Sequence, residues 1–328
     1  LAVESDARIT WVRSGAGTGK TTVIRARAIR NAENNRSSLI TTFTRDASRE
    51  LKDRINTGEI RTLGSLAWKL SEPVRRGKKI ISDVSRSGFI REKLLARENI
   101  SEGLADDNFN DNHNAVVKGV ALMHSNGISG AEIENWPGID QELADVLLSY
   151  DQYLDDNMLF DPAMMFIHAR ASITDNEREY DEILVDESQD LSFGQLMMIK
   201  ELAGERASVF FVGDDDQAIY SFRGAIPNLM SKEFSFSLNG PDGDKTGYFS
   251  LTDNYRSTRQ ILEPALKVIN SNPGHEKKIL DSNRDGPPVR ILNMVTEKKE
   301  ALDICSEIQE LVAKGVTPGE ITAISPGV

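Results

Sequence analysis

Short apolar runs alternate with amphipathic segments before residue 73 and again after residue 160. Runs such as 9–12 and 38–43 are apolar and rich in β-branched residues, which is typical of parallel strands buried on both faces. Segments with apolar residues at helical spacing follow them. The predicted strands cover residues 9–12, 38–43, 60–63, 182–186 and 208–213, and the predicted helices cover residues 22–32, 44–54, 193–202 and a segment from about residue 65. This alternation predicts an α/β fold with a doubly wound parallel sheet.

The pattern changes between residues 75 and 159, where no convincing strand is found. Helical periodicity recurs there over residues 87–97, 115–123 and 141–154, which predicts an inserted helical subdomain. A turn cluster at residues 239–244 indicates a domain boundary. The elements predicted beyond it are strands at 248–251, 289–292 and 321–324 and helices at 258–269 and 298–314. We expect them to begin a second α/β unit that stops short of a complete sheet.

The net charge of −12 is unevenly distributed along the 328 residues. Residues 98–161 contain fourteen acidic residues and one basic residue, whereas residues 13–30 contain five bases and no acid. We expect the acidic block to be a solvated helical surface and a poor surface for phosphate contacts. The average charge therefore does not exclude a nucleic-acid partner.

Cysteine and apolar content restrict the class of protein further. The single cysteine, Cys305, excludes an internal disulfide and favours a reducing compartment. Four scattered histidines without cysteine partners match no zinc pattern. No apolar run approaches the ~18 residues of a membrane span, and no secretory leader opens the chain. We expect a cytoplasmic (intracellular) protein, bacterial or viral in an infected cell, with no membrane partner.

The run Ser14-Gly-Ala-Gly-Thr-Gly-Lys-Thr21 lies between a predicted strand and a predicted helix. Glycines in this position let backbone N–H groups curl around a phosphate, and the helix N-terminus adds partial positive charge. Lys20 is expected to reach the β- and γ-phosphates, and the Thr21 hydroxyl to ligate Mg²⁺. Ser14 stands where the strict pattern has its first glycine. The run predicts a nucleoside triphosphate site.

Two carboxylates, Asp186 and Glu187, close the apolar strand 182–186. Adjacent residues at a strand end point in different directions, so one carboxylate can hold a metal while the other orients water. We assign Asp186 to Mg²⁺ and Glu187 to the water. Together with the phosphate loop, this pair predicts hydrolysis rather than nucleotide binding alone.

Glutamine, arginine and aromatic residues follow the strand 208–213. Gln217 is suited to sense a γ-phosphate while staying neutral, and Tyr220, Phe222 and Arg223 follow it closely. Aromatic faces and arginine stack on unpaired bases; core packing is the alternative reading of Tyr220. A third cluster, Asn254-Tyr255-Arg256, offers an aromatic ring for a nucleobase and an arginine for transferring phosphate charge.

The ordered set of motifs resembles the UvrD/Rep/PcrA helicases of superfamily 1. The motifs that carry the resemblance are residues 14–21, Thr-Phe-Thr-Arg-Asp-Ala-Ser-Arg-Glu-Leu at 42–51, Val-Asp-Glu-Ser-Gln-Asp at 185–190, residues 212–225 and Asn-Tyr-Arg-Ser-Thr at 254–258. Thr62-Leu-Gly-Ser-Leu66 stands where the family usually has Thr-Phe-His-Ser-Leu. The resemblance implies a RecA-like P-loop NTPase sheet with an inserted helical subdomain and the start of a second RecA-like domain.

The same resemblance implies a role for each motif residue. Those implied to be catalytic are Glu187, Lys20, Gln217 and Arg256. Those implied to bind ATP are Gly15, Ala16, Gly17, Thr18, Gly19, Lys20, Thr21, Thr22, Tyr255 and Arg256. Thr21 and Asp186 are implied to hold Mg²⁺, and the implied DNA contacts are Phe43, Thr62, Tyr220, Phe222 and Arg223. The domains expected are residues 1–74 plus 160–243 (first RecA-like), 75–159 (helical insertion) and 246–328 (second RecA-like, incomplete).

The resemblance therefore predicts an ATP-dependent helicase and translocase on single-stranded DNA, with 3′→5′ polarity implied by the family. The expected partners are single-stranded DNA and single/double-strand junctions, and the chain resembles roughly the first half of such an enzyme. One alternative is the helicase part of a recombination helicase–nuclease, which a downstream nuclease domain would reveal. Another is a truncated nucleotide- or DNA-binding module without turnover, and a simple P-loop kinase is a third.

Overall fold

A computed structural model describes residues 1–98, 107–130, 133, 141–219, 224–226, 229–230, 246–272 and 277–324. Within the chain, residues Leu1–Arg284 form one compact unit and Asp285–Val328 a second. The described helices include none that is long and apolar enough to cross a membrane. The short 3₁₀ helices are η1 (Ala2–Glu4), η4 (Pro162–Met164), η5 (Ser188–Asp190), η6 (Asp215–Gln217) and η9 (Pro318–Glu320).

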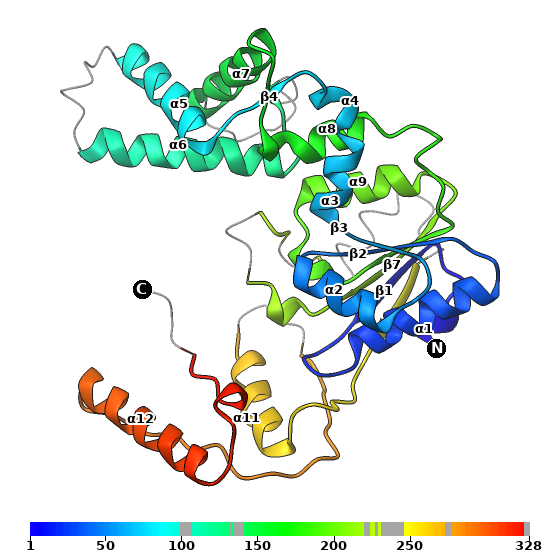
Figure 1. Cartoon of the computed structure of the whole chain (residues 1–328), viewed down its shortest axis with the longest axis vertical. Coiled ribbons are helices and arrows are strands. Elements are labelled where there is room, and N and C mark those ends of the chain that lie inside the picture. The colour runs from blue at the N-terminus through cyan, green and yellow to red at the C-terminus, as the bar shows by residue number, and fades with distance from the viewer. Residues whose placement is uncertain are drawn as a thin grey trace. The chain divides into compact units, whose positions relative to one another are not determined.

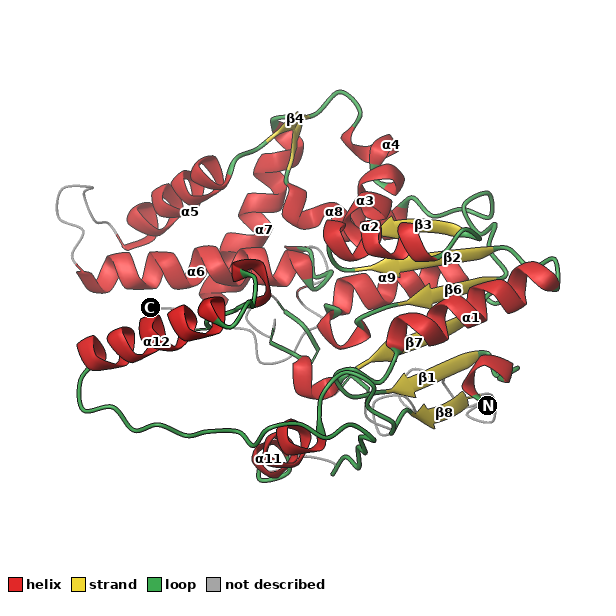
Figure 2. Ribbon diagram, turned by 60° about the horizontal axis from the view of Figure 1, so that its bottom comes forward, coloured by secondary structure: helices red, strands yellow, loops and turns green. Residues whose placement is uncertain are grey.

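A six-stranded sheet organises the first unit. Its order is β3-β2-β6-β7-β1-β8, and every neighbouring pair is parallel (Figure 2). The strands are β1 (Ile9–Arg13), β2 (Ser38–Thr42), β3 (Glu59–Thr62), β6 (Glu182–Val185), β7 (Ser208–Gly213) and β8 (Thr246–Ser250). The predicted α/β class with a parallel sheet is confirmed, and all parallel strands end at one edge, where loops can assemble a site.

Helices cover both faces of this sheet, as expected for a doubly wound fold. Side chains alternate along each strand, so Trp11 packs into one apolar core and the adjacent Val12 into the other. The helices α1 (Lys20–Glu33) and α2 (Arg45–Arg54) pack on the Val12 face. The helices α3 (Leu63–Leu70), α8 (Met165–Ala171) and α9 (Phe193–Ala203) pack on the Trp11 face.

Local capping explains where the helices begin. The Thr44 side chain accepts a hydrogen bond from the backbone N–H of Ala47 at 3.1 Å, as its position before α2 predicts. At α9, Ser192 and Gln195 form a reciprocal capping box. These caps fix where α2 and α9 begin, and so they fix the ends of the loops that connect β2 to α2 and β6 to α9.

The helical insertion lies beside the sheet as a separate small bundle (Figure 1). Its helices are α5 (Asp83–Glu98), α6 (Asp107–Ser125) and α7 (Gln141–Asp156), with the short α4 (Glu72–Arg75) before them. They enclose their own apolar core. Two short strands, β4 (Lys79–Ile80) and β5 (Leu159–Phe160), pair in parallel where the chain enters and leaves the insertion. The expectation of no strand here is wrong in this detail, because two residues carry too little pattern to be recognised.

The region after residue 246 departs from the prediction. The strand expected to open a second sheet is β8, which pairs with β1 at the edge of the first sheet. The strands predicted at 289–292 and 321–324 are not formed: both segments are irregular, and Ile291 is 88% exposed. A strand needs a hydrogen-bonded neighbour, and the described residues of the second unit offer none. The helices α11 (Arg259–Ile269) and α12 (Glu297–Ala313) form as expected.

Candidate active site

The phosphate loop occupies the turn between β1 and α1. Gly17 and Gly19 have φ angles of 74° and 89°, a left-handed conformation that side-chain-bearing residues disfavour. Gly19 is the N-cap of α1, and the amides of Thr22 and Val23 donate to its carbonyl. The loop therefore delivers the positive end of a fourteen-residue helix to the edge of the sheet.

Ser14 replaces the usual first glycine without strain. Its backbone N–H and its hydroxyl both donate to the carbonyl oxygen of Gly213, at 2.9 and 2.8 Å. The side chain is buried against the end of β7, next to β1. A serine at this position therefore ties the loop to the neighbouring strand, and the departure from the strict motif does not disturb the loop.

A cavity of about 320 Å³ lies above the phosphate loop. Its lining residues are Ala16, Gly17, Thr18, Gly19, Lys20, Thr21, Thr22, Ala47, Glu50, Leu51, Arg54, Asp186, Glu187, Gln217, Tyr255 and Arg256. All four residues predicted to be catalytic, and every predicted ATP contact except Gly15, line this one cavity. Its volume is within the range of small-molecule sites, about 300–1,000 Å³.

Lys20 and Glu187 face each other inside the cavity. The Lys20 Nζ lies 2.7 Å from the Glu187 Oε2; the Lys20 side chain is 13% exposed and the Glu187 side chain is 33% exposed. Glu187 has φ 49° and ψ 45°, the left-handed region, which costs about 1–2 kcal/mol for a residue with a Cβ. Strain of this kind clusters at functional sites. The backbone therefore holds the Glu187 carboxylate in an unusual direction, toward the phosphate loop.

Asp186 is suited to a divalent cation. Burial and the nearby negative charge of Glu187 raise the pKa of its carboxyl to about 7. A cation at that carboxylate would compensate the buried charge. Thr21, which carries a hydroxyl group, lines the same cavity. Within the described residues no cluster of three or more His, Cys, Asp or Glu could hold a metal. One hydroxyl and one carboxylate, completed by phosphate oxygens, match the sparse protein ligation that Mg²⁺ adopts with nucleotides.

Glu187 is hydrogen-bonded to the Gln217 loop through Gln189 and Asp214, which are not among the site residues predicted from the sequence. Gln189 Nε2 donates to the Glu187 Oε2 at 3.0 Å, and Gln189 Oε1 accepts from the Asp214 N–H at 2.9 Å. Gln217 Nε2 in turn donates to the Asp214 Oδ2 at 2.5 Å. Lys278, 8% exposed, forms an ion pair with Asp214. The only sequence signal for this chain of hydrogen bonds, which we call the relay, is that polar residues follow the adjacent strands β6 and β7.

The segment around Tyr255 docks onto the phosphate loop. The Tyr255 N–H donates to the Gly17 carbonyl at 2.9 Å, and Asn254 Nδ2 donates to the Ala16 carbonyl at 2.5 Å. Tyr255 is 67% exposed at the cavity, so its ring is accessible to a planar ligand. The side chain of Leu280 lies directly against Gly15. These contacts bring the Asn254-Tyr255-Arg256 cluster to the phosphate loop.

The predicted DNA contacts are only partly described. Tyr220, Phe222 and Arg223 lie outside the described residues. Phe43 follows the end of β2 and is half-buried. Thr62 ends β3, and its side chain caps α3 by accepting from the Ser65 N–H at 3.1 Å.

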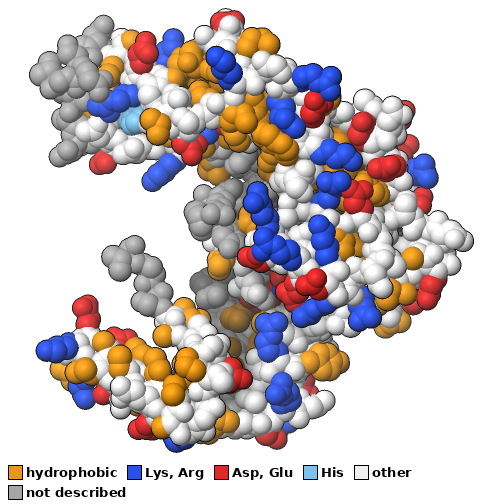
Figure 3. Space-filling model, viewed as in Figure 1, with side chains coloured by type: hydrophobic (Ala, Val, Ile, Leu, Met, Phe, Trp, Pro, Cys, Tyr) orange, Lys and Arg blue, Asp and Glu red, His pale blue; other side chains and the backbone are white. Residues whose placement is uncertain are grey.

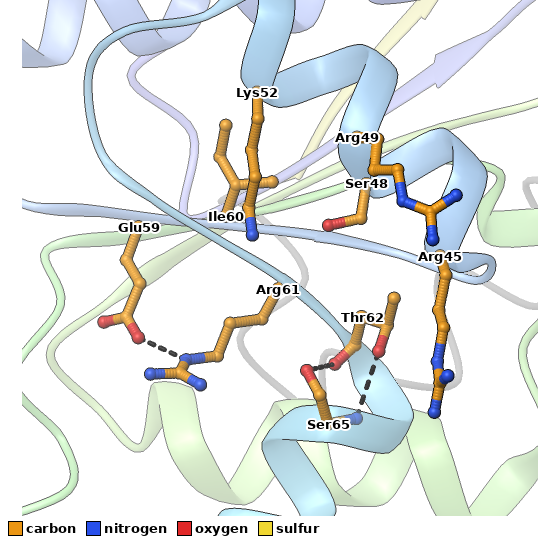
Figure 4. Close-up of a pocket in the computed structure, with 9 residues that line it drawn as sticks. All are labelled: Arg45, Ser48, Arg49, Lys52, Glu59, Ile60, Arg61, Thr62 and Ser65. Carbon is orange, nitrogen blue, oxygen red and sulfur yellow. Dashed lines mark hydrogen bonds and ion pairs between the residues drawn. The ribbon is translucent and has the colours of Figure 1, made fainter.

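Thr62 also lines a second cavity, of about 390 Å³, which we call the basic groove (Figure 4). The basic groove is lined by Arg45, Ser48, Arg49, Lys52, Glu59, Ile60, Arg61, Thr62 and Ser65. It lies against α2, β3 and the start of α3, where Lys and Arg side chains gather on the surface (Figure 3). Of these lining residues, only Thr62 is among the DNA contacts predicted from the sequence.

Comparison with known proteins gives two family matches. The description "UvrD/REP helicase N-terminal domain" matches residues 1–236, and "UvrD-like helicase C-terminal domain" matches residues 249–324. The chain is 27% identical to the putative ATP-dependent DNA helicase YjcD of Bacillus subtilis, over 95% of this chain and 43% of that protein. It is 30% identical to the ATP-dependent DNA helicase srs2 of Schizosaccharomyces pombe, over 95% and 39%. It is 26% identical to the ATP-dependent DNA helicase PcrA of Staphylococcus aureus, over 91% and 43%. The chain thus spans less than half the length of these relatives.

Proposed function

Because the chain belongs to the UvrD/REP helicase family, as its motifs predicted, we propose that it is the ATP-hydrolysing part of a helicase that moves along single-stranded DNA. The observation that carries the proposal is the single cavity in which four separate motifs meet above the phosphate loop. The family resemblance adds 3′→5′ polarity and action at single/double-strand junctions to the proposal.

In the proposed mechanism, ATP bound with Mg²⁺ supplies the phosphoanhydride bond and the cation that neutralises its oxygens. Thr21 and Asp186 would hold the cation. Lys20 lies 2.7 Å from Glu187 and would exchange this partner for the β- and γ-phosphates. Glu187, released from the ion pair, would then accept a proton from the attacking water. Lys20 would thus hold Glu187, the general base, in an ion pair until a triphosphate competes for the lysine.

Gln217 and Arg256 would recognise the γ-phosphate in this proposal. Gln217 donates to Asp214, so its position depends on the relay that ends at Glu187. Arg256 follows the docked Tyr255 and lines the cavity, where a guanidinium stabilises charge on a transferring phosphate. Tyr255 would stack on the adenine. Base and phosphate recognition would therefore share one short segment.

We further propose that residues 1–74 plus 160–243 are the first RecA-like domain and 75–159 its inserted helical subdomain. In the same proposal, the second RecA-like domain, predicted as residues 246–328, opens after β8, because β8 pairs with β1 in the first sheet. A DNA strand would cross the carboxyl edge of the sheet, contacting Phe43 and Thr62 together with Tyr220, Phe222 and Arg223. Parallel strands place such residues at the edge that also carries the nucleotide.

The test measures ATP hydrolysis and Mg-ATP binding by this chain, with and without a single-stranded oligonucleotide. We expect Lys20→Ala to lose binding. We expect Glu187→Gln to keep binding but to lower turnover by about 10²–10⁴-fold, the usual contribution of a general base. Glu72→Gln, a change on the exposed α4, serves as the matched control. Hydrolysis by Glu187→Gln at the wild-type rate would refute the catalytic assignment. Binding without turnover in the wild-type chain would leave a nucleotide-binding module.

A further inference from the structure

The loop after β7 begins with three consecutive acids, Asp214, Asp215 and Asp216. Adjacent like charges repel one another, so this run needs cations to hold one conformation. Arg13 of β1 lies 3.6 Å from Asp215. Lys278 pairs with both of the other acids, and its Nζ lies 2.7 Å from the Asp216 Oδ2. One lysine from a distant segment therefore binds two of the three acids.

The pair of Lys278 and Asp214 is buried and fully hydrogen-bonded. The Lys278 side chain is 6% exposed and that of Asp214 is 3% exposed. Buried charges are stable in proteins when they are paired and hydrogen-bonded. The Asp214 Oδ1 accepts from Lys278 Nζ and from the Asp216 N–H, and its Oδ2 accepts from Gln217 Nε2 at 2.5 Å. Lys278 therefore binds one oxygen of Asp214, and the other oxygen holds the Gln217 amide.

Anchoring the amide prepares Gln217 for a ligand in the nucleotide cavity, which it lines. A glutamine side chain has several rotatable bonds, and holding it beforehand lowers the entropy that a ligand must overcome. The amide nitrogen carries two N–H groups, so a bond to Asp214 uses only one of its two donors. The Asp214 carboxylate thus fixes the direction of the amide without using all of its donors.

The segment that carries Lys278 also supports the Tyr255 side of the cavity. An isolated parallel bridge joins Asp253 to Asp281, three residues after Lys278. The chain continues from Asp253 into Tyr255, whose N–H donates to the phosphate loop. Lys278 therefore connects the Tyr255 segment to the loop that carries Gln217.

We propose that Lys278 is a positioning residue for recognition of the γ-phosphate, because through Asp214 it holds Gln217 in the orientation that a nucleoside triphosphate requires. This inference rests on the proposed function, because it takes Gln217 as the residue that recognises the γ-phosphate. Lys278 is not among the described residues that line the nucleotide cavity, so it acts through Asp214. Its loss would weaken recognition of the third phosphate and spare that of the base and the first two phosphates.

The test compares the affinities of the chain for Mg-ADP and for the magnesium complex of AMP-PNP, a non-hydrolysable ATP analogue, by isothermal titration calorimetry. Lys278→Met removes the buried ammonium group. Lys277→Met is the matched control, because it removes the same charge from the neighbouring, exposed lysine. Arg86→Met is a second control, because it breaks a buried ion pair with Asp161 that is outside the cavity lining.

A double variant keeps the test decisive where Lys278→Met alone does not fold. Lys278→Met with Asp214→Ala leaves no unpaired charge between these two positions, and it also removes the anchor of Gln217. Thermal unfolding of every variant is recorded first, and the titrations are run below the lowest melting transition.

We expect Lys278→Met and the double variant to bind AMP-PNP about tenfold more weakly than the wild type, the worth of one hydrogen bond to a charged group. ADP binding should change by less than about twofold, because ADP has no γ-phosphate. Both controls should keep both affinities. This split between the two nucleotides is a result that a purely structural role of Lys278 would not produce.

Gln217→Ala completes a double-mutant cycle with Lys278→Met. We expect Gln217→Ala to weaken AMP-PNP binding by a similar factor, and Lys278→Met to add little to it, because the two residues act as one unit. Losses that multiply in the combined variant would overturn the inference. An unchanged AMP-PNP affinity in Lys278→Met and the double variant, or affinities for ADP and AMP-PNP that fall together, would also overturn it. These three results would leave the proposed function intact.

Two other results would reach the proposed function itself. Wild-type affinity for AMP-PNP in Gln217→Ala would refute the role of Gln217, and with it the inference about Lys278. A wild-type chain that binds neither nucleotide would overturn both proposals.

Discussion

The ion pair between Arg27 and Glu182 gives the sharpest stability prediction. Arg27 on the phosphate-loop helix α1 donates through Nε and Nη2 to both oxygens of Glu182 on β6, each at 2.8 Å. Both side chains are 1% exposed. Asn31 Nδ2 and the Ser208 hydroxyl also donate to Glu182, at 2.6 and 2.8 Å. The pair therefore joins the two elements that position the phosphate loop and Asp186.

Replacing Glu182 with Gln would leave the Arg27 guanidinium buried without its counter-charge. Breaking a buried pair in this way costs about 3–5 kcal/mol. For a domain of this size the melting temperature should fall on the order of 10 °C. The double variant Arg27→Met with Glu182→Leu should be less destabilised than Glu182→Gln, because it removes both charges.

The chain contains a matched control for burial. Arg76 donates to Glu72 with the same two-pronged geometry, at 2.9 and 3.1 Å, but that pair lies on the surface. Glu72→Gln should leave the urea midpoint and the melting temperature unchanged. A loss for Glu182→Gln as small as that for Glu72→Gln would refute the reasoning that burial, rather than geometry, sets the cost.

The same pair predicts a pH dependence. Burial alone would raise the pKa of the Glu182 carboxyl, but hydrogen bonds from Arg27 and Asn31 outweigh it and hold the pKa below its usual value of 4.5. The pair's contribution is therefore complete above about pH 4.5 and is lost as the pH falls through the folded-state value. Thermal unfolding from pH 7 to pH 3 should show the gap between wild type and Glu182→Gln narrowing below about pH 4.5.

Three further predictions concern the active site. The free energy of unfolding of Glu187→Gly should exceed that of Glu187→Ala by about 1 kcal/mol, because glycine accepts the left-handed backbone at this position. Glu187→Gly should therefore melt at the higher temperature, and equal melting curves would contradict this. Gly15→Ala should weaken nucleotide binding, because the new methyl group meets the Leu280 side chain, and adding Leu280→Ala should restore it in a fluorescent-nucleotide titration. Lys278→Met should cost about 3–5 kcal/mol in urea unfolding, because it leaves the buried carboxylate of the loop after β7 unpaired, and an unchanged midpoint would argue against that pairing.

The parallel sheet and the meeting of motifs could be predicted because both depend on local sequence. The run 208–213 is apolar at almost every position, and β7 covers the same residues. The motifs around Lys20, Asp186 and Gln217 each follow a strand, and parallel strands end at one edge, so their meeting in one cavity follows from the fold class. Their chemical roles remain predictions.

What could not be predicted depends on contacts between distant residues. Lys278 lies in an irregular segment, and only the fold brings its side chain to Asp214. The basic groove combines residues of α2, β3 and α3 whose individual charges are those of an ordinary surface. Residues 289–292 have a strand-like composition, but composition does not supply the neighbouring strand that a ladder needs.

The place of β1 in the sheet has a consequence for folding during synthesis. Its two neighbours are β7 and β8, so Ile9 pairs with Val209 on one side and Thr246 on the other. At typical elongation rates the ribosome needs on the order of 10–40 s between the synthesis of Ile9 and the synthesis of Val209. During this time the strand has no sheet partner, and an unpaired apolar strand is a template for aggregation. We expect the chain to complete its sheet slowly and late, with β1 the segment most in need of a chaperone.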